Sequence, residues 1–273
     1  MQQTILTIEK NEHVTRDVMK MVLAGAGLEE HRPGQFINIK IEDMFLRRPI
    51  SVNDYEPGRV TLLYKIVGKG TSVMSRMFPG EKLDVLTGLG NGFDPADAGD
   101  APLLVGGGIG TAPLYYLAKK LRAEGKDVTV ILGFNNKPEI FYEDEFKALG
   151  CRVLVSTADG SYGVKGFVTD AAKTLISECA GKTAEAAGTA VTAAGEAVQA
   201  GLPWSYAYVC GPEPMLKAIY PMLPKAQLSF EERMGCGFGA CMGCSCKTIT
   251  GYKRICKDGP VLRREEILWE EHK

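Results

Sequence analysis

A short stretch near the carboxyl end of the chain, residues 232–256, carries four cysteines in the spacing C-x4-C-x2-C-x11-C: Cys236, Cys241, Cys244 and Cys256. Glycines separate the first three, and glycine allows the tight turns that aim backbone N–H groups at sulfur atoms. The first three spacings match the plant-type ferredoxin run, which also has a more distant fourth cysteine. We therefore predict a [2Fe–2S] cluster bound by these four cysteines.

Other uses of closely spaced cysteines fit this segment less well. A structural zinc site usually has two C-x2-C pairs or includes histidines, and only one such pair is present here. A redox-active C-x-x-C lies between a strand and a helix rather than in a glycine-rich loop. Zinc stays open as the alternative metal. A fifth cysteine, Cys246, follows Cys244 at i+2; in an extended segment its side chain points away, so we leave it out of the ligand set.

Composition excludes several classes of protein. The chain has 273 residues, a formal net charge of -1 and no block of lysines and arginines, which argues against nucleic-acid binding. No apolar stretch is long enough to span a membrane and the first residues show no signal pattern, so we expect a cytoplasmic protein. The three histidines, His13, His31 and His272, lie outside the motifs. We expect them on the surface or in loops, and their positions exclude a two-histidine Rieske cluster.

The first hundred residues contain short alternating apolar segments separated by glycine and proline turns. Strands are predicted at residues 4–9, 17–23, 35–41, 49–52, 60–66 and 82–86. Six strands at this spacing predict a small antiparallel barrel.

Two barrel motifs suggest anion binding. Arginines precede Pro49-Ile50-Ser51, and an arginine fork followed by a hydroxyl can bind a phosphate, although a solvated charge pair is the alternative. The segment 68–72 predicts a glycine turn into a short helix with Thr71 or Ser72 as N-cap. Such a helix start either binds an anion or is an ordinary capped end.

Residues 101–227 alternate strands and helices, which predicts a doubly wound parallel sheet. Strands are expected at 103–105, 128–134, 152–156 and 206–210, with helices ending near 121, at 143–149, from about 167 and after 214. A glycine loop, Gly108-x-Gly110-Thr111-x-Pro113, follows the first strand, and Cys210-Gly211 follows the last. Dinucleotides bind at the carboxyl ends of parallel strands, so both segments are candidates for such a site. We interpret the alanine-rich stretch at about 180–202 as a surface insertion.

Barrel, dinucleotide sheet and cysteine-rich tail, in this order, resemble the ferredoxin–NADP reductase superfamily. Within it the chain is similar to the electron-transfer subunits of NAD-dependent dihydroorotate dehydrogenases. The matching segments are Arg48-Pro49-Ile50-Ser51, Gly70-Thr71, residues 106–110, 210–215, 232–237 and 256–261. The resemblance implies an FAD-binding barrel at 1–100, an NAD-binding domain at 101–227 and a [2Fe–2S] module at 228–273.

The resemblance also implies where the cofactors bind. Arg48, Pro49, Ile50 and Ser51 would lie along the flavin and its phosphates, Leu63, Tyr64 and Lys65 would flank it, and Gly70 and Thr71 would meet its pyrophosphate. NAD would bind at Gly108, Gly110, Thr111, Cys210 and Gly211. Both Lys137 and Glu139 follow the second parallel strand, so spacing alone leaves NAD and NADP open.

The same resemblance implies a function and a partner for this chain. A separate FMN-containing dihydroorotate dehydrogenase catalytic subunit would supply electrons, in a heterotetramer of two chains of each kind. We expect no catalytic acid or base in this chain, because the cofactors carry the chemistry. One alternative is the small subunit of an NADH-dependent ferredoxin:NADP oxidoreductase or a sulfide dehydrogenase, in which one cluster ligand is an aspartate. Another is a flavin-free module with a zinc knuckle that docks a partner.

Overall fold

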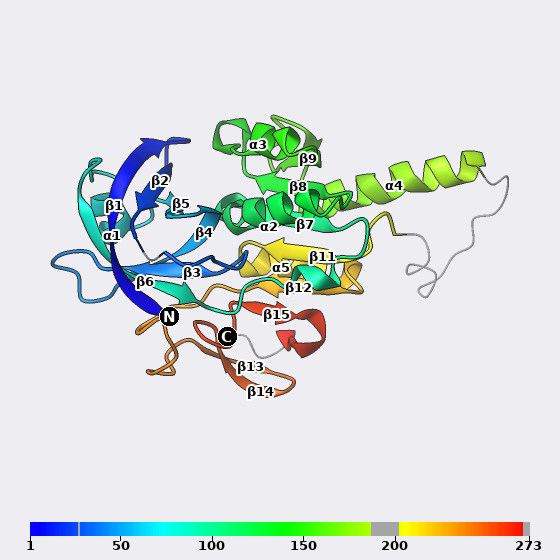
Figure 1. The fold of residues 1–273 in the computed structure, drawn as a ribbon. Helices are drawn as coiled ribbons and strands as arrows, with labels where there is room; N and C mark the ends of the chain where they lie inside the picture. Colours follow the sequence, from blue (N-terminus) through cyan, green and yellow to red (C-terminus); the bar gives the residue numbers. More distant parts are fainter. Residues whose placement is uncertain (27, 187–201, 270–273) are drawn as a thin grey trace.

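The computed structural model describes residues 1–26, 28–186 and 202–269. A barrel occupies one side of the molecule, an α/β domain the other, and the carboxyl-terminal segment lies beneath both (Figure 1). Among the helices of these ranges, none combines the length and apolar character of a membrane span.

The amino-terminal domain is a closed six-stranded antiparallel barrel, which confirms the prediction. Its strand order is β1-β2-β5-β4-β3-β6. The strands are β1 (Gln2–His13), β2 (Val18–Ala24), β3 (Phe36–Ile39), β4 (Arg48–Glu56), β5 (Arg59–Lys65) and β6 (Lys82–Leu89), and α1 (Lys69–Met74) lies between β5 and β6. Alternate side chains of each strand fill the interior, because side chains of a strand point to opposite faces in turn. The barrel therefore has a core of its own.

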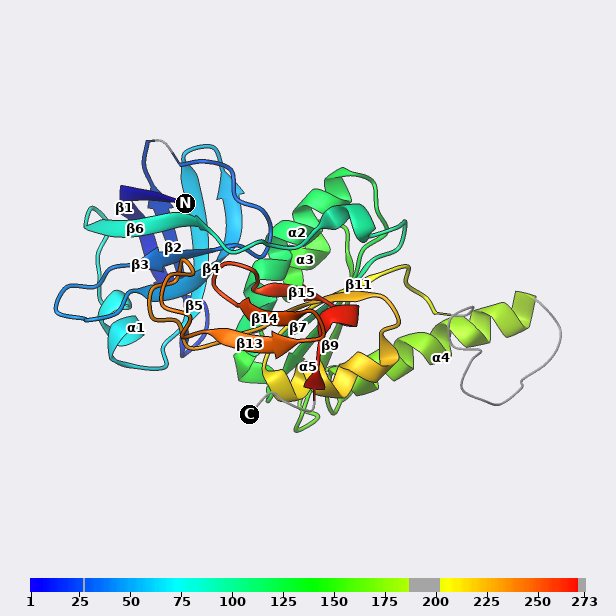
Figure 2. The ribbon, with the colours of Figure 1, turned by 90° about the horizontal axis from the view of Figure 1, so that it is seen from below.

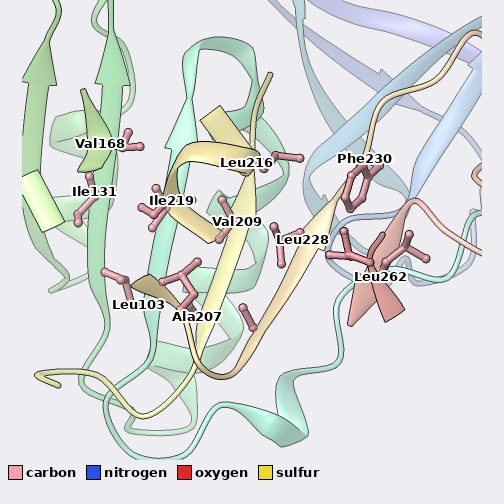
Figure 3. Close-up of a cluster of buried hydrophobic side chains, with 14 of the residues drawn as sticks. Leu103, Ile131, Val168, Ala207, Val209, Leu216, Ile219, Leu228, Phe230 and Leu262 are labelled. Carbon is pink, nitrogen blue, oxygen red and sulfur yellow. The ribbon is translucent and has the colours of Figure 1, made fainter. Parts of the chain in front are cut away.

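The second domain is a seven-stranded, mostly parallel sheet in the order β10-β9-β8-β7-β11-β12-β15. Its strands are β7 (Leu103–Gly107), β8 (Thr129–Phe134), β9 (Arg152–Thr157), β10 (Val164–Lys165), β11 (Ala207–Cys210), β12 (Ala226–Ser229) and β15 (Val261–Arg263). Its helices are α2 (Ala112–Ala123), α3 (Glu143–Ala148), α4 (Val168–Ala186) and α5 (Glu213–Ile219). α2 and α3 contribute to one apolar cluster and α4 and α5 to another, so both faces of the sheet are covered as a doubly wound fold requires. Figure 3 shows the second cluster, with Ile219 and Leu216 of α5 over Val209 of β11.

The carboxyl-terminal segment completes the sheet of the second domain. β15 pairs antiparallel with β12, placing Leu262 opposite Leu228 (Figure 3). β13 (Ser245–Thr248) and β14 (Gly251–Arg254) form a separate two-stranded sheet. The expected boundary at 227/228 falls inside β12. Residues 261–263 are thus joined to the second domain by main-chain hydrogen bonds.

One sequence expectation is wrong in detail. The N-cap of α1 is Gly68 rather than Thr71 or Ser72, and the Thr71 hydroxyl instead accepts hydrogen bonds from the N–H groups of Val67 and Gly68. His31 lies in a loop and is buried there, at 2% exposure. Residues 187–201, most of the alanine-rich stretch, and His272 lie outside the described residues.

Candidate cofactor and cluster site

The four cysteines predicted as ligands lie as two adjacent pairs. The Cys236 N–H donates to Cys241 Sγ at 3.4 Å, and Cys236 Sγ accepts from the N–H groups of Ala240 and Cys241 at 3.2 and 3.5 Å. In the second pair, the Cys256 N–H donates to Cys244 Sγ at 3.4 Å. Across the described residues, no three His, Cys, Asp or Glu side chains are grouped to hold a metal ion. The observed arrangement is two pairs of thiols served by backbone donors, the environment that iron–sulfur clusters use.

Backbone donors also change the acidity of the first thiol. Burial opposes ionisation of Cys236, but hydrogen bonds from the backbone at Phe238, Cys241 and Ala240 outweigh it and lower the pKa to about 6. A thiolate is the form that binds metal, so this position is prepared for a ligand role. Burial raises the pKa of Cys256 to about 12, and both the hydrogen bond with Cys244 and the charge of the Cys244 thiolate add to this rise.

Cys246 is packed in the same apolar cluster as Cys244 and Cys256. It is 6% exposed on β13, within the apolar cluster that includes Leu228 and Leu262. Burial raises the pKa of its thiol to about 11. Cys256 is also buried and has a raised pKa, so the exclusion of Cys246 from the ligand set stays a prediction from the cysteine spacing.

An ion pair lies beside the loop between Cys236 and Cys241. The Arg254 guanidinium binds both oxygens of Asp258 at 2.9 and 3.1 Å and donates to the Gly239 carbonyl at 3.0 Å. Arg254 thereby joins the end of β14 to the loop between Cys236 and Cys241. No sequence pattern marks Arg254, because its partners Asp258 and Gly239 lie on different turns.

The two arginines before Pro49 have different roles. Arg47 forms a bidentate pair with Asp84 of β6, with distances of 3.0 to 3.1 Å, and donates to the Asn38 carbonyl. Burial opposes the charged Asp84 carboxylate, but Arg47 and Gln3 outweigh it and lower its pKa. Arg47 is therefore engaged in holding β6 to the β3–β4 loop.

Arg48 instead lies against the start of α1. A Cβ added to Gly70 would be 2.1 Å from Arg48 Nε, so the arginine side chain crosses this helix where only glycine leaves room. Arg48 makes no ion pair among the described residues; its guanidinium donates to the carbonyl groups of Leu46 and Arg47. A cation beside a helix start is a suitable arrangement for a phosphate. The structure thus brings Arg48 and Gly70 together.

The next predicted segment, Leu63 to Lys65, alternates across β5. Tyr64 is buried inside the barrel at 1% exposure and donates from its hydroxyl to Asn11 Oδ1 at 3.0 Å. Lys65 lies on the opposite side and pairs with Asp17 at 3.0 Å, and Leu63 belongs to the apolar cluster shared with α2. Tyr64 can therefore face a bound group only through its main chain.

The glycine loop and the end of β11 meet at the carboxyl edge of the sheet. A Cβ on Gly110 would be 2.4 Å from the Cys210 carbonyl oxygen and 2.7 Å from Gly211 Cα. Gly108 has φ +52, a conformation that favours glycine, and Pro113 occupies the first turn of α2 as predicted. Thr111 is fully buried below the loop. The structure therefore joins the two halves of the predicted dinucleotide site.

The cysteine segment also contacts the barrel. Asn38 of β3 donates from Nδ2 to the Cys236 carbonyl at 3.3 Å, and a Cβ on Gly237 would be 2.2 Å from the same nitrogen. Figure 2 shows this loop, just before β13, beside β3 and β4. Asn38 was not among the predicted site residues, although a single polar residue in the apolar strand Phe36–Ile39 is a signal.

Comparisons with known proteins agree with this geometry. Residues 231–268 match the iron-sulfur cluster binding domain of dihydroorotate dehydrogenase B, and residues 104–220 match an oxidoreductase NAD-binding domain. A protein of Geobacillus sp. (strain WCH70) is 41% identical over 98% of this chain and 99% of its own length. One of Fusobacterium nucleatum is 42% identical over 96% of each. Both are named dihydroorotate dehydrogenase B (NAD(+)), electron transfer subunit.

The chain belongs to this family of electron transfer subunits. It is thus an oxidoreductase subunit of the dihydroorotate dehydrogenase B type, with an iron–sulfur cluster-binding domain and an NAD-binding domain. Among solved structures, that of an NADH-dependent reduced ferredoxin-NADP oxidoreductase is similar, with 31% identity, a TM-score of 0.80 and coverage of 98% of this chain and 91% of the other. A ferredoxin NADP+ reductase from Neisseria gonorrhoeae, with 18% identity, a TM-score of 0.62 and coverage of 83% and 93%, shares the fold.

Proposed function

We propose that this chain carries electrons from an FMN-containing dihydroorotate dehydrogenase catalytic subunit, through a [2Fe–2S] cluster and FAD, to NAD+ during UMP synthesis. The names of the relatives support the reaction, since they combine dihydroorotate dehydrogenase, NAD(+) and electron transfer. The working assembly in this proposal is a heterotetramer of two chains of each kind.

Cys236, Cys241, Cys244 and Cys256 are the proposed cluster ligands. Two adjacent thiol pairs suit two irons, each bound by one pair, and the backbone N–H groups already point at three of the sulfurs. Bound FAD and cluster together convert between hydride transfer and single-electron transfer. The protein contributes the placement of the two groups.

Arg48 and Gly70 are the proposed contacts for the flavin pyrophosphate, because the Arg48 side chain lies over the start of α1. Pro49, Ile50 and Ser51 continue along β4 from this point. Leu63, Tyr64, Lys65 and Thr71 complete the proposed FAD site; Tyr64 would contribute its main chain, and Thr71 keeps the turn at Gly68 in shape.

For NAD, the proposed site is the junction of Gly108, Gly110 and Thr111 with Cys210 and Gly211. The close approach of Gly110 to Cys210 leaves the main chain of both loops at the sheet edge, where a dinucleotide can lie against it. This edge faces the barrel, since Asn53 of β4 donates to the Ala112 carbonyl at 2.9 Å.

One observation carries the proposal. The loop that holds the first cysteine pair is hydrogen-bonded to β3, the strand paired with the Arg48–Ser51 segment of β4. A cluster and a flavin bound at these sites would therefore be neighbours in one protein, as electron transfer between them requires. Phe238 and Met242, beside Cys241, are exposed, and we propose that the catalytic subunit covers them.

An anaerobic assay of dihydroorotate-dependent NAD+ reduction tests the proposal. The chain is assayed alone and after co-purification with its FMN-containing partner. We expect activity only with both chains. A brown flavoprotein that oxidises NADH but never couples to dihydroorotate would contradict the substrate assignment while leaving the cofactors in place.

A second function has a specific observation in its favour, the 0.80 TM-score to the NADH-dependent reduced ferredoxin-NADP oxidoreductase. In the same assay, this alternative predicts NADH-dependent electron exchange with ferredoxin and NADP+ and none with dihydroorotate. The four-cysteine segment and its match to the dihydroorotate dehydrogenase B domain favour the first function.

A further inference from the structure

Asn38 is a buried polar residue in an otherwise apolar barrel strand. Its relative exposure is 1%, and its neighbours Ile37 and Ile39 are fully buried. In the β3–β4 ladder Asn38 is directly opposite Pro49, a residue of the proposed flavin segment. A buried amide in such a position needs hydrogen-bond partners to offset its loss of hydration.

The side-chain amide of Asn38 finds its partner outside the barrel. Nδ2 donates to the Cys236 carbonyl at 3.3 Å, across 198 residues of sequence, while Oδ1 has no hydrogen-bond partner among the described residues. The carbonyl fixes the orientation of the amide, because only the nitrogen can donate to it. One side chain thus connects the strand beside Pro49 to the first proposed cluster ligand.

Gly237 is shaped to receive this amide. Its φ is +79, and an added Cβ would be 2.2 Å from Asn38 Nδ2 but 3.8 Å from Asn38 Cβ. An alanine at 237 would therefore collide with the amide, while Asn38 Cβ would be at an ordinary contact distance. The steric fit places the turn after Cys236 on Asn38, and the positive φ separately favours glycine at 237.

We propose that Asn38 is a positioning residue that fixes the Cys236 end of the cluster-binding loop against the proposed flavin strand. The inference rests on the proposed function, in which cluster and flavin exchange electrons. Losing the amide leaves both cofactor sites complete but releases the contact between them. The expected effect therefore falls on the cluster's surroundings and on transfer between the two groups, and not on hydride transfer from NADH.

Two variants, Asn38→Ala and Asn38→Asp, test the role in the cofactor-loaded protein. The first removes the donor, and the second keeps the size but places an acceptor against the Cys236 carbonyl. Dithionite replaces NADH as the reductant, and the electron paramagnetic resonance spectrum of the reduced cluster is recorded directly. We expect altered g-values or broadened lines in both variants with wild-type iron content.

Stopped-flow reduction by NADH supplies the kinetic readout. Flavin reduction should stay within about twofold of wild type, while the cluster reduction that follows slows about fivefold or more. Asn53→Ala is the matched control, because Asn53 is also a buried barrel asparagine but donates to Ala112 of the second domain. Its cluster spectrum should equal that of wild type.

Gly237→Ala disrupts the same contact from the cysteine-containing loop. It keeps the inference testable if the Asn38 variants do not fold. In the wild-type background it should alter the cluster spectrum. In the Asn38→Ala background the clash is absent, since the nearest remaining atom is 3.8 Å away, and only the backbone strain at φ +79 remains, so the added change should be smaller. Equal changes in both backgrounds would overturn the inference.

Different results would contradict the proposed function and the positioning role of Asn38. If the wild-type chain shows no [2Fe–2S] signal, the proposed function fails and the inference falls with it. If wild type shows the signal and folded Asn38 variants keep both its spectrum and its rate of cluster reduction, only the positioning role is wrong.

Discussion

Gly110→Ala tests the dinucleotide site, because the added Cβ would overlap main-chain atoms of the neighbouring loop. The new Cβ would be 2.4 Å from the Cys210 carbonyl oxygen, 2.6 Å from its carbon and 2.7 Å from Gly211 Cα, all of them main-chain atoms. Ordinary contacts of this kind are about 3.5–4 Å, so the glycine loop and the end of β11 must separate by roughly 1 Å. A displacement of that size at a binding site can cost about 100-fold in rate.

We expect the rate of NADH-driven flavin reduction at subsaturating NADH to fall by tenfold or more, about 1.4 kcal/mol, in anaerobic stopped-flow measurements. Overpacking should also cost about 1–3 kcal/mol of stability. Gly125→Ala is the control: Gly125 follows α2 with φ +77 and has nothing within 4 Å of an added Cβ, so only backbone strain of about 1 kcal/mol is added. Flavin reduction by Gly110→Ala within about twofold of this control would refute the reasoning.

Three further outcomes are expected. Asp84→Asn should lower the free energy of unfolding by about 1–2 kcal/mol at pH 7, because the pair with Arg47 is only about one-fifth exposed. The pKa of Asp84 is lowered by folding, so the stabilisation is complete above pH 3.8 and is lost as the pH falls through the lowered value; denaturant curves of variant and wild type should converge in acid. Cys244→Ser should abolish iron binding while Cys246→Ala keeps about two irons per chain, and equal iron loss in both would contradict the ligand set. Glu139→Lys should shift the ratio of kcat/KM for NADPH over NADH upward by about tenfold, since the Glu139 carboxylate is held by two asparagine amides after β8; an unchanged ratio would place the ribose elsewhere.

Local chemistry explains what could be predicted from the sequence. The barrel was predicted from alternation and turn residues, and the second domain from strands that alternate with helices. Pro113 marked the start of α2 because a missing N–H is harmless in the first turn. These signals act over a few residues, so one chain without relatives is enough to read them.

Features that depend on distant partners were beyond such a reading. β15 has three residues, too few for a periodic pattern, and exists because β12 offers it an edge. At α1, threonine is usually an N-cap, but here the Thr71 hydroxyl turns back to the main chain of the preceding turn. Asn38 differs from its apolar neighbours in the sequence, yet its partner is 198 residues away.

The pairing of β15 with β12 has a consequence for how the chain is made. A nascent chain emerges from the ribosome amino end first, so β12 is made before its partner β15, which spans Val261–Arg263. Until this segment emerges, β12 has an unpaired edge of the kind that invites wrong partners. Closure of the sheet therefore occurs only after the cysteine segment, which lies between β12 and β15, has been made. A chain cut short just before residue 261 would keep all four proposed ligand cysteines but leave the NAD-binding domain with an open edge.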